Sequence, residues 1–220
     1  MMKRLKSGLI VAVAVVVGLL TTTAAASAAT VSAAGQPNSV GVVGGSITKL
    51  AVQGYRDQGG TVVWPPYDIG GGTIFAWKNN PAYFHLFEQM LGQFPNTSQV
   101  WWQLAAHDYD LPGVTLQQLY ATSVTVLNGI RQRTGPNTVV VASVMADYAP
   151  DTGCYLRGIV VQAPAKLQAV LDRLVSEGLV TAGPHMPTLH RDELQNNGDN
   201  CHQNPLGQQH HGRVLHDYFG

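Results

Sequence analysis

"SVGVVGGSITKLAVQGYRDQG", residues 39–59, is an apolar run that breaks at two glycines and a serine before a more polar segment. Residues 39–44 have the composition of a buried strand. Residues 47–59 are typical of a short helix that ends at a glycine. A strand that passes directly into a helix is the building unit of α/β folds, and Ser46 stands at the junction.

Strands and helices alternate along the rest of the chain. Four further strands are predicted at 61–64, 98–106, 137–145 and 179–185. Four further helices are predicted at 81–94, 115–135, 163–178 and 205–219. The alternation favours a mostly parallel, five-stranded sheet with helices on both faces. The carboxyl ends of its strands should meet at one edge, where ligands bind in such folds.

The N-terminus has the order of a secretory signal peptide. Residues 1–29 carry three positive charges, then an apolar run, then small residues, which predicts cleavage after Ala28 or Ala29. The alternative is a retained membrane anchor, but the apolar run of about a dozen residues is short for a span. We therefore expect a secreted, extracellular protein, bacterial from its Ala/Val-rich leader. Residues 30–38 would be a flexible mature terminus and 39–220 a single domain.

Composition excludes some partners. The chain has 220 residues, of which 45% are hydrophobic and 12% charged, and its formal net charge is zero. This balance gives no electrostatic basis for binding nucleic acid or an anionic membrane surface. Histidines crowd the C-terminus, at His210, His211 and His216, without a standard zinc spacing. We expect a monomer with no metal, no cofactor and no stable membrane anchor.

The motif "DNCHQNPLG", residues 199–207, lies in the predicted loop before the last helix. Asp199 and His202 are three residues apart, so the carboxylate can reach the imidazole and hold one tautomer. A histidine held in this way can take the proton from a serine hydroxyl. Ser46 should lie at the same edge of the sheet. The alternative for Ser46 is a helix N-cap and nothing more.

Four segments together resemble the SGNH (GDSL-type) hydrolases. They are "VVGGSIT" (42–48), "GGG" (70–72), "WWQLAAHD" (101–108) and "DNCHQNPLG" (199–207), and they occur in the family's order. The resemblance implies a three-layer α/β/α sandwich of flavodoxin-like type. It also implies ester hydrolysis through an acyl-serine intermediate, with Ser46 as nucleophile, His202 as base and Asp199 as its orienting acid.

The same resemblance implies an oxyanion hole with one departure from the family. The backbone N–H of Ser46 and that of Gly71 or Gly72 would be two donors. The family's third donor is an asparagine side chain, and His107 stands at that position. A ring N–H of His107 could replace the amide. The alternative is a hole with two backbone donors only, and the loss of one donor costs about a hundred- to a thousandfold in rate.

Two further features bear on the site. Cys154 and Cys201 are the only cysteines, and in an exported protein we expect them to be paired rather than two free buried thiols. The bond would clamp the loop after the fourth strand to the Asp199–His202 loop. Trp77 follows the glycine loop and is the candidate for a surface platform that binds substrate.

The sequence thus predicts a secreted serine esterase that acts on acyl or acetyl esters, small or carbohydrate-borne. One alternative is a catalytically impaired extracellular binding protein that keeps the fold. The other is an acyltransferase that uses the same serine and excludes water from its site.

Overall fold

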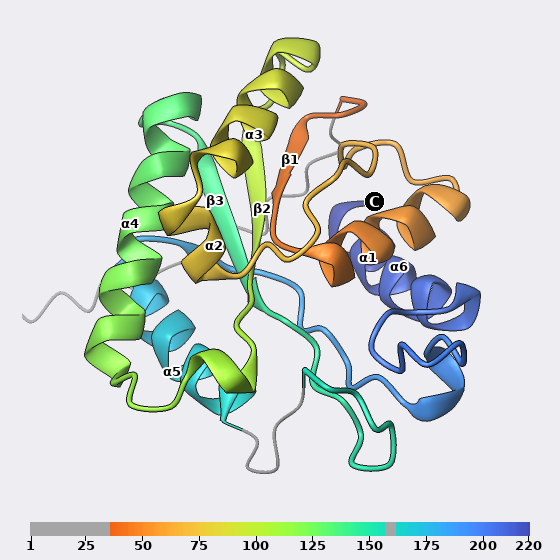
Figure 1. Ribbon diagram of the computed structural model, residues 1–220. Helices are drawn as coiled ribbons and strands as arrows, with labels where there is room; N and C mark the ends of the chain where they lie inside the picture. The colour runs from red at the N-terminus through yellow and green to blue at the C-terminus, as the bar shows by residue number, and fades with distance from the viewer. Residues whose placement is uncertain (1–35, 157–161) are drawn as a thin grey trace, which may run out of the picture. The chain divides into compact units, whose positions relative to one another are not determined.

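Four parallel strands form the sheet of the computed structural model, which describes residues 36–156 and 162–220 (Figure 1). They are β1 (Val40–Val43), β2 (Gln99–Leu104), β3 (Val139–Val144) and β4 (Thr181–Ala182), in that order across the sheet. Each neighbouring pair is parallel. The predicted signal peptide and most of 30–38 lie outside the described residues.

The prediction of five strands is wrong. Residues 61–64 form only a single parallel bridge, between Val63 and Val40 at the outer edge of β1. Two prolines, Pro65 and Pro66, follow at once, and a proline has no N–H with which to extend the ladder. The strand predicted at 179–185 is real but is only two residues long.

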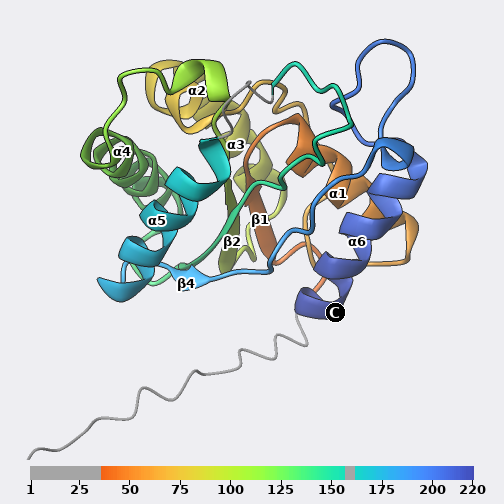
Figure 2. The same cartoon turned by 90° about the horizontal axis from the view of Figure 1, so that it is seen from below.

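The described part contains six α-helices. They are α1 (Ser46–Asp57), α2 (Ile74–Asn79), α3 (Pro81–Gln93), α4 (Leu116–Thr134), α5 (Ala163–Ser176) and α6 (Pro205–Phe219). Helix α2 was not expected, because its six residues are too few to show a helical period. Figures 1 and 2 show α1 and α6 on one side of the sheet and α4 and α5 on the other. Within the described ranges no helix is long and apolar enough to cross a membrane.

Helices α1 and α6 pack backbone to backbone, side by side in Figure 2. Glycines allow this approach: a Cβ on Gly212 would lie 2.2 Å from the carbonyl carbon of Gly54. A Cβ on Gly54 would lie 1.8 Å from the carbonyl oxygen of Gln208. The contact holds α6, and therefore the loop that leads into it, against the helix that begins with Ser46.

Candidate active site

Ser46 is the first residue of α1, three residues after Val43, the last residue of β1. The N-cap of the helix is Gly45, whose N–H donates to Thr48 Oγ1 at 2.9 Å. The alternative that Ser46 is merely the N-cap is therefore wrong, and its hydroxyl is available for another contact. Its backbone N–H lies in the first helical turn, where N–H groups have no partner within the helix and the helix dipole is positive.

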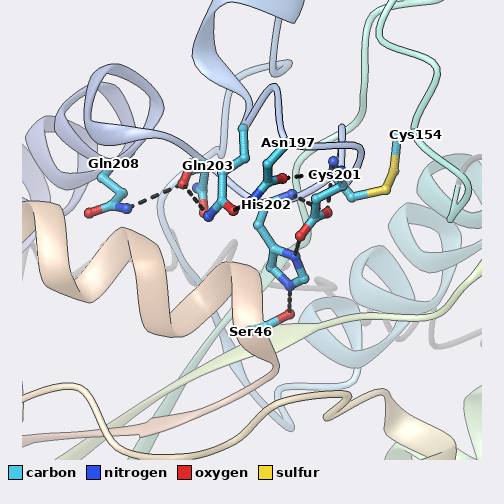
Figure 3. A network of polar contacts seen from close by, with 9 residues as sticks. Ser46, Cys154, Asn197, Cys201, His202, Gln203 and Gln208 are labelled. Carbon is cyan, nitrogen blue, oxygen red and sulfur yellow. Dashed lines mark hydrogen bonds and ion pairs between the residues drawn. A yellow bond between two sulfur atoms is a disulfide. The ribbon is translucent and has the colours of Figure 1, made fainter.

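The hydroxyl of Ser46 meets the imidazole of His202 (Figure 3). Ser46 Oγ lies 2.8 Å from His202 Nε2, and His202 Nδ1 lies 2.5 Å from Asp199 Oδ2. The side chains of His202 and Asp199 are 26% and 25% exposed, so the group is half-buried and open to solvent on one side. Serine, imidazole and carboxylate form an unbroken chain of hydrogen bonds, as the sequence predicts.

The second oxygen of Asp199 holds the loop itself. Its Oδ1 accepts the backbone N–H groups of Cys201 and His202, both at 3.2 Å. Burial by itself would raise the pKa of Asp199, but the hydrogen bonds from His202 and from these N–H groups outweigh it and lower the pKa. The carboxylate therefore stays ionised at neutral pH and directs the proton of His202 to Nδ1.

Asn204 anchors the end of the same loop. Its Oδ1 accepts the N–H groups of Leu206 and Gly207, and so caps α6. Its Nδ2 donates to the carbonyl oxygens of Asp192 at 2.7 Å and Leu194 at 3.0 Å. One side chain thus ties the helix start to the segment that precedes the loop.

The predicted disulfide is confirmed. Cys154 and Cys201 are joined, with an S–S distance of 2.07 Å, and the alternative of two free thiols is wrong. Cys201 is fully buried and directly precedes His202. The bond fastens the loop after β3 to the Asp199–His202 loop, as expected.

A small hollow opens beside Ser46. The volume of this hollow is about 30 Å³, which leaves room for about two water-sized groups. Its lining includes Gly71, Gly72, Gln103 and His107. A larger groove of about 380 Å³ lies between the ends of β3 and β4 and the start of α5, and Met145 lines both spaces.

The glycine loop reaches the hollow because it has no side chains. A Cβ on Gly72 would lie 1.9 Å from the carbonyl oxygen of Gly44, and Gly71 has a left-handed φ of 69°. The N–H of Gly72 donates to the carbonyl of Ile69 at 3.2 Å. The N–H of Gly71 has no hydrogen bond among the described residues. Both glycines line the hollow at the place where the sequence predicts an oxyanion donor.

His107 lines the hollow in a tautomer that does not suit a donor. Its Nδ1 lies 3.2 Å from Asp110 Oδ2, and a carboxylate at that distance favours the proton on Nδ1. Burial lowers the pKa of His107, although Asp110 opposes the shift, so the ring is neutral at neutral pH. Its Nε2 then carries a lone pair. The predicted role of His107 as donor would require the imidazolium form.

Trp77 is not a surface platform, and this prediction is wrong. Its side chain is 1% exposed and packs against Tyr83, Phe84 and Phe87. Its indole Nε1–H donates to the carbonyl of Gly44 at 2.8 Å. The buried indole of Trp77 therefore supports the backbone just before Ser46 through this hydrogen bond.

Sequence reasoning missed two residues of the site. Thr48 Oγ1 accepts from Gly45 and donates to Gln103 Oε1 at 2.6 Å, so both side chains support the turn before Ser46. Gln103 gave a signal, since it is an amide within the apolar run "WWQLAA". Thr48 gave none, because a threonine in the first turn of a helix is ordinary.

Two polar groups outside the hollow have structural partners. Asp108 organises the chain around its own loop, because its Oδ1 accepts the N–H groups of Gln162 and Ala163 at the start of α5, both at 2.8 Å. His210 pairs with Glu193 at 2.5 Å. Within 36–156 and 162–220, no three His, Cys, Asp or Glu side chains gather in a way that could hold a metal ion.

Comparisons with known proteins identify the fold. No protein-family model and no curated protein matches the sequence. Among solved structures, a candidate SGNH hydrolase from Slackia heliotrinireducens matches with a TM-score of 0.52 and 14% identity, over 82% of this chain and 98% of that one. A protein from Lactobacillus plantarum matches with a TM-score of 0.51 and 13% identity, over 84% and 97%. The chain has an SGNH-type hydrolase fold.

Proposed function

We propose that this protein is a serine ester hydrolase that works through an acyl-serine intermediate. The observation that carries the proposal is the 2.8 Å contact between Ser46 Oγ and His202 Nε2, with Asp199 bonded to the other ring nitrogen. A hydroxyl so placed can lose its proton as it attacks a carbonyl.

In the first step, His202 Nε2 takes the proton of Ser46 while Oγ forms a bond to the ester carbonyl carbon. The carbonyl oxygen becomes an oxyanion. Ser46, Gly71 and Gly72 line the hollow in which this oxygen would lie, so the backbone N–H of Ser46 and that of Gly71 or Gly72 are the proposed donors, and the N-terminus of α1 adds a favourable field. The C–O bond to the alcohol then breaks, and His202 gives its proton to the departing oxygen.

The second half repeats these steps with water. His202 takes a proton from water, the hydroxide oxygen attacks the acyl carbon, and the bond to Ser46 Oγ breaks as His202 returns the proton to Oγ. Asp199 keeps the imidazole in the required tautomer and stabilises the imidazolium in each half. Free serine and a carboxylic acid remain.

The dimensions of the site favour a short acyl group on a larger alcohol. The hollow beside Ser46 has room for about two water-sized groups, as an acetyl group requires. The groove on the other side of Met145 is more than ten times larger and includes the polar side chains of Asp147, His185 and Thr188. Such a groove suits a hydroxyl-rich alcohol, including a carbohydrate.

We further propose that the three-layer enzyme, residues 39–220, is monomeric and acts outside the cell after removal of 1–29. The disulfide between Cys154 and Cys201 supports an oxidising compartment. Neither nucleic acid nor a membrane anchor has a part in this account.

Hydrolysis of p-nitrophenyl esters tests the proposal. Acetate should be cleaved faster than hexanoate or longer esters, and Ser46→Ala and His202→Ala should each lower kcat by at least about a thousandfold. His190→Ala, a histidine outside the hydrogen-bonded group, is the matched control and should keep wild-type rates. No hydrolysis by the folded wild type, or equal rates for Ser46→Ala, would overturn the proposal.

A further inference from the structure

Gln103, one of the residues that line the hollow, carries a pair of side-chain N–H donors without a partner among the described residues. It belongs to β2, its side chain is 1% exposed, and it lines the hollow together with Ser46. Its Nε2 is buried and has no hydrogen-bond partner among the described residues. A buried amide without an acceptor costs about 1–3 kcal/mol, so such a group calls for a specific explanation.

The orientation of the amide follows from its neighbours. Thr48 Oγ1 accepts the N–H of Gly45 and donates its own proton to Gln103 Oε1, 2.6 Å away, which is the one acceptor that this hydroxyl has among the described residues. This contact occupies the oxygen end of the amide. The nitrogen end is therefore the one that remains available, and the same hydrogen-bond chain fixes it relative to the turn before Ser46.

We infer that the side-chain amide of Gln103 is the third oxyanion donor, in the role that the resemblance to the SGNH hydrolases implies for position 107. The inference rests on the proposed function. As Ser46 Oγ attacks the ester, a Gln103 N–H bonds the carbonyl oxygen and strengthens that bond as the oxygen becomes negative. The amide is uncharged, so this donor is present at every pH at which the protein is folded. His107 instead offers a lone pair at Nε2.

Gln103→Glu removes the donor and places a carboxylate at its position. The carboxylate keeps an oxygen for Thr48 and nearly the same shape, but it replaces the two N–H groups with an oxygen. Gln99→Glu is the matched control, because Gln99 is also buried, on the same strand and the same face. Gln99 pairs with Val40 at the far end of β1, six residues before Ser46.

With p-nitrophenyl acetate, Gln103→Glu should lower kcat by about a hundred- to a thousandfold and change KM by less than about threefold. Gln99→Glu should keep kcat within about threefold of wild type. Thermal unfolding of both variants measures any loss of stability. If Gln103 has only a structural role, its replacement should act through stability alone, as the replacement of Gln99 does.

A second measurement on the wild type does not depend on a variant that folds. An alkyl fluorophosphonate forms an adduct on Ser46 whose phosphoryl oxygen occupies the oxyanion position. The NMR signals of the Gln103 side-chain NH₂ should move downfield on adduct formation, while those of Gln99 stay in place.

The outcomes separate the two claims. An active wild type with an equally active Gln103→Glu variant, or unmoved Gln103 signals in the adduct, would overturn the role of Gln103 and leave the esterase standing. A folded wild type with neither turnover nor adduct would overturn the esterase, and the role of Gln103 with it.

Discussion

Asp199 uses its two oxygens for two tasks. One accepts the N–H groups of Cys201 and His202, and the other bonds the imidazole. The hydrogen bonds that hold the loop therefore also place the carboxylate beside the imidazole. Because the pKa of Asp199 is lowered, the acid limb of the activity profile should not arise from its protonation.

Asp199→Asn should lower kcat by about ten-thousandfold. The amide still accepts the loop N–H groups through its oxygen, but its NH₂ group faces Nδ1 and forces the proton to Nε2, where Ser46 needs an acceptor. Initial rates with a short ester measure the effect. Asp192→Asn, an exposed carboxylate that precedes the same loop, is the control and should change nothing. A variant at Asp199 with near-wild-type rates would contradict the role.

The sequence was informative at Ser46, Asp199 and His202, because two of them are three residues apart and parallel topology brings strand ends to one edge. It misplaced Trp77, since an indole after a glycine loop fits a surface platform as well as a buried support. The Gln103 contact could not be predicted. It depends on how a helix turn seats on a neighbouring strand, and no local pattern specifies that.

At the scale of elements, the crossing of α1 and α6 brings together residues 156 positions apart in the sequence. The loop of His202 enters α6, and Ser46 begins α1. The distance between the two helices therefore sets the distance between the imidazole of His202 and the hydroxyl of Ser46. Because Gly54 and Gly212 let the two backbones touch at the crossing, this distance can change little.

Gly212→Ala should destabilise the protein by about 1–3 kcal/mol or more and lower kcat. Its methyl group would lie 2.2 Å from the backbone of Gly54, so the helices must separate and His202 must move away from Ser46. Chemical denaturation and ester hydrolysis measure the two effects. Gly92→Ala in α3 has open space at the Cβ and should be neutral or stabilising by up to about 1 kcal/mol. Equal effects at the two glycines would refute this explanation.

The disulfide should support activity as well as stability. Cys154→Ala with Cys201→Ala opens a link across 47 residues, worth on the order of 4 kcal/mol in the chain-entropy model. The Asp199–His202 loop should loosen first. Reduction of the wild type should thus lower kcat at temperatures where circular dichroism still reports a folded domain. Full activity in the reduced, folded protein would show that the bond does not position the loop.

Elements were predictable where their patterns were long. Helices α4 and α6 and strand β3 lie within a residue or two of their predicted bounds. The pattern of 61–64 is that of a strand, but the two prolines that follow leave a single bridge. Tertiary packing decides whether such short apolar segments pair, and composition does not.

At the scale of the whole molecule, His211 links stability to pH. It is fully buried in α6, where Nδ1 lies 2.6 Å from Gln203 Nε2 and Nε2 lies 3.1 Å from the carbonyl oxygen of Pro187. Both contacts suit the neutral ring. Burial lowers the pKa of His211 to about 4, although the Pro187 carbonyl opposes the shift.

The free energy of unfolding should therefore fall as the pH drops. The unfolded chain, with a histidine pKa of about 6.5, binds the proton more tightly than the folded one. The stabilisation that neutral His211 contributes is complete above pH 6.5 and is lost between about pH 6.5 and pH 4, with about 2 kcal/mol lost from pH 7 to pH 5.

Urea unfolding of wild type and His211→Gln at pH 7 and pH 5 measures this loss. His107 also has a lowered pKa, so the difference between the two proteins is the relevant quantity. If the free energy of unfolding changes by the same amount between the two pH values in both proteins, the assignment to His211 is contradicted.

The central claim is that Ser46 is an activated nucleophile, and intact-mass analysis after treatment with a fluorophosphonate tests it most directly. At neutral pH the mature wild-type protein should gain the mass of one adduct, and Ser46→Ala should gain none. A folded wild type that stays unlabelled, or an adduct that persists in Ser46→Ala, would contradict the account.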